Sequence, residues 1–107
     1  MARSAEFFNL YRHGFVRVAL ATPRVRIADP AFNAAQTLAL MREAARARAV
    51  LAVFPELGLT AYTAEDLFHQ QALLRGAEDA LSGLLARSKD LPVAAFVGLP
   101  VAVDGLL

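Results

Sequence analysis

The 107-residue sequence contains no cysteine, no tryptophan and a single lysine, Lys89. Without cysteine the chain can form no disulfide and can supply no thiolate, either as a metal ligand or as a nucleophile. The two histidines, His13 and His69, lie too far apart in the sequence to form a zinc-binding pair by spacing. We therefore predict that this chain binds no metal ion.

The sequence also lacks a strong excess of charge and a long apolar run. Ten arginines and one lysine balance ten acidic residues, and the net charge is +1. The basic residues are scattered, and Arg42, Arg46 and Arg48 are interpreted as part of a solvated helix face. Nucleic acid is therefore not an expected partner. No apolar run reaches 18 residues and the first residues lack a signal-peptide core, so we expect no membrane segment and a cytoplasmic location.

Hydrophobic residues are in excess for a chain of this size. They make up 57% of the sequence, compared with about 45 to 50% in typical soluble proteins. The length is sufficient for one small domain, and the excess predicts apolar surface that another part of a protein covers. The last eight residues end in two leucines without a polar tail, which is unusual for a domain boundary. We expect one incomplete domain.

Hydrophobic patterning predicts three strands, at residues 15–22, 49–54 and 93–99, and two helices, at 30–47 and 71–88. The first strand becomes continuously apolar, which is typical of a strand covered on both faces. The order strand, helix, strand, helix, strand is typical of an α/β layer, in which right-handed crossovers put both helices on one face.

Capping residues and helical spacing support both helices. Asp29 followed by Pro30 is typical of a helix start, and Thr63 before two acidic residues predicts a further short helix. Two sets of residues at helical spacing should face the core. They are Ala34, Leu38, Met41 and Ala45 in the first helix, and Leu73, Leu74, Ala77, Leu81, Leu84 and Leu85 in the second.

Glu56 is the strongest candidate for chemistry. The apolar run 49–54 delivers it to the end of a strand, Pro55 ends the strand's hydrogen bonding, and Gly58 allows a turn. Burial between Phe54 and Leu57 would remove water from the carboxylate and raise its pKa toward the range useful for proton transfer. Alternatively, Glu56 caps a helix or points into solvent. The local sequence leaves both interpretations open.

The motif Phe-Pro-Glu-Leu at 54–57, followed by Gly-Leu-Thr-Ala-Tyr, resembles the first catalytic block of the nitrilase, or carbon-nitrogen hydrolase, superfamily. Three other segments are similar to the glutaminase domain of bacterial glutamine-dependent NAD+ synthetases: residues 8–19 with Tyr-Arg-His-Gly-Phe, residues 29–33, and residues 65–70 with Asp-Leu-Phe. One position departs from the motif, because Ala61 stands where the family usually has glycine. If the backbone there needs a positive φ, alanine is strained.

The resemblance implies a fold and an extent for the chain. The fold would be part of a nitrilase-like α-β-β-α sandwich, consisting of its strand-helix-strand-helix-strand portion. Residues 1–107 would form the N-terminal portion of the glutaminase domain, truncated, with the synthetase domain absent.

The resemblance also implies site residues. Glu56 would be the general base, and Tyr62 would line the substrate site, unless it is a core tyrosine with a hydrogen-bonded hydroxyl. The family's cysteine and catalytic lysine would lie beyond this chain, because the residues around Lys89 do not match the lysine block and instead predict a polar loop. The chain alone should therefore be inactive.

No Gly-rich phosphate loop occurs in the sequence, so we expect no cofactor in this chain, with ATP and Mg in the synthetase domain of the parent. The implied partners are glutamine, as the substrate of the complete domain, and the remainder of the synthetase. The complete protein is expected to be a homo-oligomer. Two alternatives stay open: a piece of a stand-alone carbon-nitrogen hydrolase or amidase, and a non-catalytic interaction module.

Overall fold

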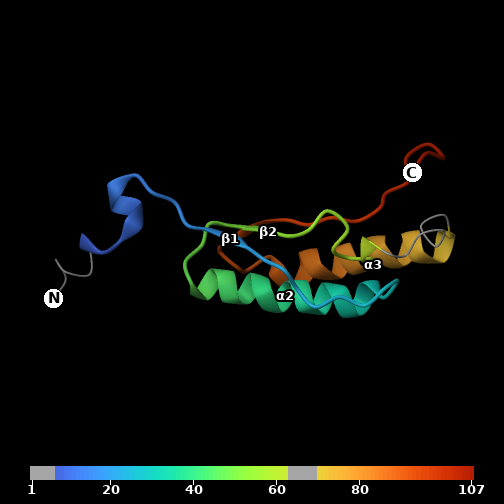
Figure 1. Ribbon diagram of the computed structural model, residues 1–107, viewed down its shortest axis with the longest axis horizontal. Coiled ribbons are helices and arrows are strands. Elements are labelled where there is room, and N and C mark those ends of the chain that lie inside the picture. The colour runs from blue at the N-terminus through green and yellow to red at the C-terminus, as the bar shows by residue number, and fades with distance from the viewer. Residues whose placement is uncertain (1–6, 63–69) are drawn as a thin grey trace.

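The computed structural model describes residues 7–62 and 70–107 (Figure 1). The elements are, in chain order, the 3-10 helix η1 (Leu10–His13), β1 (Val18–Leu20), α2 (Pro30–Arg46), β2 (Leu51–Val53), α3 (Gln71–Ser88) and β3 (Ala94–Phe96). The short helix predicted to begin near Thr63 lies outside the described residues. Neither α2 nor α3 has the length and apolar content that a bilayer crossing requires.

The three strands form a parallel sheet in the order β1-β2-β3. The sheet is one layer and α2 and α3 together form a second layer beneath it (Figure 1). The prediction of an α/β layer with both helices on one face is therefore confirmed. The order also places β2 in the centre, with a partner on each side.

The core lies between the helices and one face of the sheet. The middle residues of the strands, Ala19, Ala52 and Ala95, face the helices, and Ala52 is fully buried. Small side chains at these positions let the helices approach the sheet closely. The buried residues that pack together here are Leu38, Met41, Ala44, Ala49, Ala52, Phe54 and Leu84.

Helix α2 begins as its sequence predicts. The Asp29 carboxylate accepts a hydrogen bond from the Phe32 amide at 3.1 Å, and Pro30 occupies the first helical position, where no N–H is needed. Ala34, Leu38 and Met41 are buried as expected, whereas Ala44 is more deeply buried than the predicted Ala45. Asn33 and Thr37 are buried on the same side.

Helix α3 spans the predicted residues, 71–88. Leu73, Ala77 and Leu84 are buried, and Leu74 and Leu81 are partly buried. The prediction for Leu85 is wrong, because this side chain is 64% exposed. Only one stripe of α3 meets α2 and the sheet, and Leu85 lies at the margin of that stripe.

The opposite face of the sheet is open among the described residues. Val18, Leu20 and Phe96 point away from the helices, and Leu20 is 84% exposed. The prediction that the first strand is covered on both faces is therefore wrong for this chain, because no described element packs over this side. The strands are also shorter than predicted, since each spans three residues, although single backbone hydrogen bonds continue the pairing beyond them.

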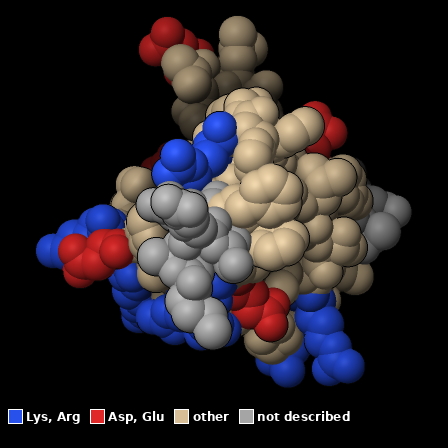
Figure 2. Space-filling model, turned by 90° about the vertical axis from the view of Figure 1, so that its left-hand side faces the viewer, with Lys and Arg blue, Asp and Glu red and all other residues tan. Residues whose placement is uncertain are grey.

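Residues 7–17 extend beyond one end of the sheet (Figure 1). The Tyr11 hydroxyl donates to the Arg48 carbonyl and the Arg17 guanidinium donates to the Ala47 carbonyl, which fastens this segment to the end of α2. Viewed from this end, basic and acidic side chains both lie around the margin of the visible surface, and a large area carries neither (Figure 2).

Candidate active site

Glu56 lies just past the carboxyl end of the central strand. The backbone of Phe54 continues the pairing with β3, since its N–H donates to the Phe96 carbonyl at 3.0 Å. On the other side, the Ala21 N–H donates to the Val53 carbonyl at 2.9 Å. In parallel sheets, ligands bind at the carboxyl ends of the strands. The prediction that β2 delivers Glu56 to this edge is confirmed.

The burial predicted for the Glu56 side chain is wrong for this chain. Glu56 is exposed, whereas Phe54 turns into the core with 8% of its surface exposed. The strand ends before Pro55 and Glu56 begins a turn, so its side chain leaves the direction that the strand gives to Phe54, and no described element encloses the carboxylate. Among residues 7–62 and 70–107 its side chain makes no hydrogen bond or ion pair. The alternative in which it points into solvent after a core strand matches this geometry, and the carboxylate is free to meet a reactant.

The loop that follows Glu56 is buried even though the carboxylate is not. Its turn is closed by the Gly58 N–H, which donates to Pro55 at 3.2 Å, and the Ala61 N–H, which donates to Leu57 at 2.8 Å. Leu59 is 1% exposed and Thr60 is fully buried. A buried backbone with internal partners has little freedom to move, so the loop presents Glu56 from a fixed base.

The side chain of Asn33, in α2, connects this loop to the segment before α2 by hydrogen bonds. Its amide nitrogen donates to the Leu59 carbonyl at 3.0 Å and to the Arg26 carbonyl at 2.9 Å, while its oxygen accepts from the Arg26 N–H at 2.7 Å. The Ala28 N–H donates to the Thr60 carbonyl at 2.9 Å. The fully buried Asn33 side chain thus ties the loop to the segment before α2. Sequence reasoning missed it, although an asparagine beside an apolar helix stripe is a signal of a buried polar contact.

Ala61 has φ 65°, in the left-handed region. Alanine at this motif position was expected to be strained if the backbone needs a positive φ, and the backbone does adopt that conformation, which glycine tolerates best. Ala61 is 6% exposed, so its Cβ is held inside the loop.

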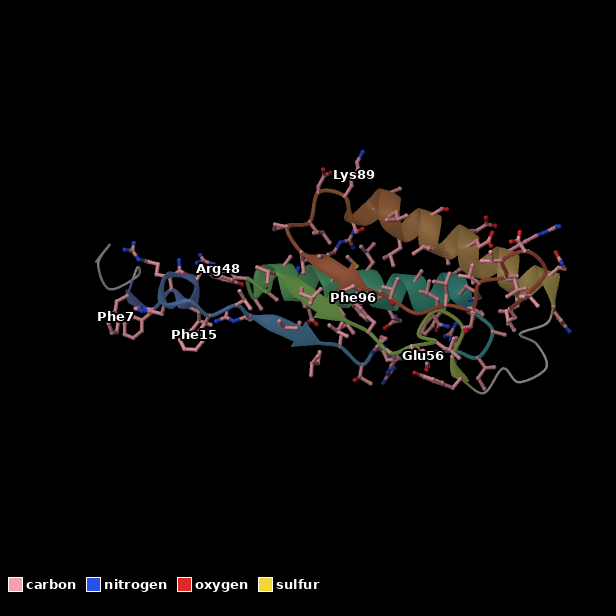
Figure 3. The ribbon with its side chains drawn as sticks, turned by 90° about the horizontal axis from the view of Figure 1, so that it is seen from above. Phe7, Phe15, Arg48, Glu56, Lys89 and Phe96 are labelled. Atoms are coloured by element: carbon pink, nitrogen blue, oxygen red, sulfur yellow. The ribbon has the colours of Figure 1, made fainter. Side chains whose placement is uncertain are left out.

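The other candidate residues lie at different places. Tyr62 follows on the same loop as Glu56 but is 54% exposed, so the alternative of a core tyrosine is wrong for this chain. Lys89 directly follows the last residue of α3 and is exposed. It lies on the far side of the molecule from Glu56 (Figure 3), so the structure does not bring the two together.

Neither a cluster of metal-binding side chains nor the groove between the helices lies at Glu56 among the described residues. Within the described ranges, no three side chains of the metal-binding types come together. A groove of ≈ 400 Å³ between α2 and α3 is lined by Asp29, Asp79 and Arg87 among others. The groove belongs to the helical layer and contains no residue of the 54–62 motif.

The known proteins that are similar to this chain are carbon-nitrogen hydrolases and glutamine-dependent NAD(+) synthetases. The family model described as carbon-nitrogen hydrolase matches residues 17–105. A glutamine-dependent NAD(+) synthetase from Mycobacterium tuberculosis is 47% identical over 95 residues, and one from Mycobacterium leprae is 41% identical over 96 residues. These matches cover 89% and 90% of this chain.

The chain spans 14% of the length of these curated relatives. A solved structure, the glutamine-dependent NAD(+) synthetase from Cytophaga hutchinsonii, superposes with a TM-score of 0.76 at 26% identity. That match covers 84% of this chain and 15% of the solved chain. The predicted partial nitrilase-like fold is confirmed by this likeness.

Replacing Ala61 with glycine should relieve backbone strain in the loop. We expect A61G to raise the free energy of unfolding by up to about 1 kcal/mol, because the relief of the left-handed conformation exceeds the added entropy of the unfolded chain. The matched control is A44G, at a buried position in α2, which should lose about 1 kcal/mol. Urea denaturation measures both, and an equal loss in the two variants would contradict the strain at Ala61.

Removing the Asn33 amide should weaken the loop's attachment. N33A leaves the Leu59 and Arg26 carbonyls without their donor, and we expect a loss of about 2 kcal/mol or more in stability. N33D keeps the size but replaces the donor with a carboxylate facing two carbonyls, so its loss should be at least as large. Q36A, at a half-buried position of the same helix, is the control. Thermal unfolding that is unchanged in N33D would show that the amide is not needed.

Proposed function

This chain belongs to the carbon-nitrogen hydrolase family, and on that basis we propose that it is the part of a glutaminase domain that carries the general base, Glu56. The observation that supports this most is the position of an accessible carboxylate on a buried loop at the carboxyl end of the central strand. The same residues make up the family motif within the matched region 17–105. The relatives' name, glutamine-dependent NAD(+) synthetase, identifies glutamine as the proposed substrate.

The proposed reaction is hydrolysis of the glutamine side-chain amide. A cysteine thiolate attacks the amide carbon, ammonia leaves, and water hydrolyses the resulting thioester to glutamate. Glu56 would take the thiol proton, pass a proton to the departing ammonia and then deprotonate the water. A lysine would stabilise the tetrahedral oxyanion by its positive charge.

Two of the three groups in this reaction must come from outside the chain. The sequence has no cysteine, and its one lysine lies away from Glu56 (Figure 3). We therefore propose that the 107 residues are the N-terminal portion of the domain and release no ammonia from glutamine by themselves. In the complete domain, further chain would cover the open sheet face around Leu20 and Phe96, because exposed apolar surface of this kind is normally buried by a partner.

In the complete protein, ammonia would pass to a synthetase domain that uses ATP and Mg to amidate deamido-NAD+. That domain would hold the nucleotide and the metal ion, and this chain would hold neither. We propose a cytoplasmic homo-oligomer for the complete protein. The exposed apolar sheet face is the one observation that favours the other candidate, a non-catalytic interaction module.

The role of Glu56 can be tested in the complete protein, of which we propose this chain to be a part. NAD+ synthesis is measured with glutamine as the nitrogen source and, separately, with free ammonia. E56Q should lower glutamine-dependent NAD+ synthesis by at least about 10²-fold, since general bases contribute 10²- to 10⁴-fold. Ammonia-dependent synthesis should be unchanged, because it bypasses the amide hydrolysis. Coupled assays of NAD+ formation with each nitrogen source measure the two rates.

The matched control for this experiment is E43Q, an exposed glutamate on α2, which should change neither rate. Persistence of the glutamine-dependent rate in E56Q would remove Glu56 from the mechanism. A complete protein with no glutamine-dependent activity at all would instead favour the interaction module.

A further inference from the structure

We propose that Gly98 is a positioning residue for Glu56, which acts by letting the backbone after β3 lie directly against the backbone of Glu56. This inference rests on the proposed function of Glu56 as the general base. Gly98 lies outside the 54–62 motif, 42 residues beyond Glu56 in the sequence.

The contact is between two backbones. A Cβ built on Gly98 would lie 1.4 Å from the carbonyl oxygen of Glu56, 2.0 Å from its carbonyl carbon and 2.7 Å from its Cα. Cβ atoms essentially never approach other heavy atoms within 3.0 Å. The colliding atoms belong to the main chain, so no side-chain rotation can relieve the clash. Only glycine fits at position 98 while Glu56 stays where it is.

The Gly98 backbone also bonds the same loop. Its carbonyl accepts the Leu59 N–H at 3.0 Å, two residues after the Phe96 carbonyl accepts the Phe54 N–H at 3.0 Å. The segment after β3 therefore holds the loop on both sides of Glu56 and touches Glu56 itself between these two bonds. Any displacement of this segment is passed directly to the backbone that carries the carboxylate.

The loop cannot withdraw from a side chain at position 98 without further loss. Leu59 and Thr60 are buried, and Asn33 and Ala28 bond to their carbonyls from the other side. Glu56 is exposed, with no described residue over its side chain, so we expect the backbone to move outward there. A Cβ at position 98 therefore displaces the carboxylate rather than the core.

The other glycines of the loop and helices show how specific this contact is. A Cβ at Gly58 would lie 3.3 Å from the Pro55 carbonyl oxygen, a contact that a small shift can accommodate. A Cβ on Gly83, in α3, would meet nothing within 4 Å. Gly83 is thus a matched control for the same chemical change without a collision.

The effect on catalysis follows from the size of the displacement. The Cβ and the Glu56 oxygen must separate from 1.4 Å to at least 3.0 Å, and a misplacement of about 1 Å is enough to cost about 10²-fold in rate. We expect G98A in the complete protein to lower kcat for glutamine-dependent synthesis by about 10²-fold. KM for glutamine and the ammonia-dependent rate should change little, and G83A should change none of these quantities.

A double variant distinguishes positioning from general damage. If Gly98 acts through Glu56, adding G98A to E56Q should cost little further activity, because the base it positions is already gone. A further loss of similar size in the E56Q background would overturn the proposal, since Gly98 would then act on the site in another way.

The activity and the folding of the single variant G98A also test the positioning role of Gly98. Full glutamine-dependent activity in G98A would overturn the positioning role. Failure of G98A to fold, seen by calorimetry and solubility beside G83A, would also count against it, because the contact would then serve the fold as a whole. The proposed function has a separate test. If the E56Q variant keeps its glutamine-dependent rate, the proposed function is wrong, whatever G98A does.

Discussion

The parallel pairing of β2 with β3 is the constraint on which the candidate site depends. It continues past the last strand residues, through the bond from Phe54 to Phe96 and then the backbone contact of Gly98 with Glu56. Because the contact is made by main-chain atoms, it fixes the Glu56 backbone whatever the side chains nearby do. The core packing of Ala52 beneath the sheet keeps the strands, and therefore this edge, in register.

The arrangement separates a rigid support from an accessible functional group. The loop carrying Glu56 has buried residues on one side, and its carboxylate is open to solvent on the other. The nearby sheet face is apolar and exposed at Leu20 and Phe96. This exposed face accounts for part of the high hydrophobic content of the sequence.

Local features of the sequence were sufficient to predict the elements but not their surroundings. The bounds of α3 and the start of α2 followed from periodicity and from the Asp29 cap, which act within a few residues. The exposure of Glu56 and the open face of β1 could not be predicted, because burial depends on what packs across space. Gly98 gave only a weak signal, a lone glycine in an apolar run, which is typical of a close backbone approach without naming the partner.

The loop carrying Glu56 is held as firmly as the strands, through its bonds to Gly98, Asn33 and Ala28. Native-state amide hydrogen exchange on the complete protein tests it most directly, by comparing residues 57–61 with the strand around Ala52. We predict that the Leu59 amide, bonded to Gly98, exchanges as slowly as the Ala52 amide, through the same cooperative opening. Exchange of Leu59 through a local opening, orders of magnitude faster than Ala52, would contradict the account.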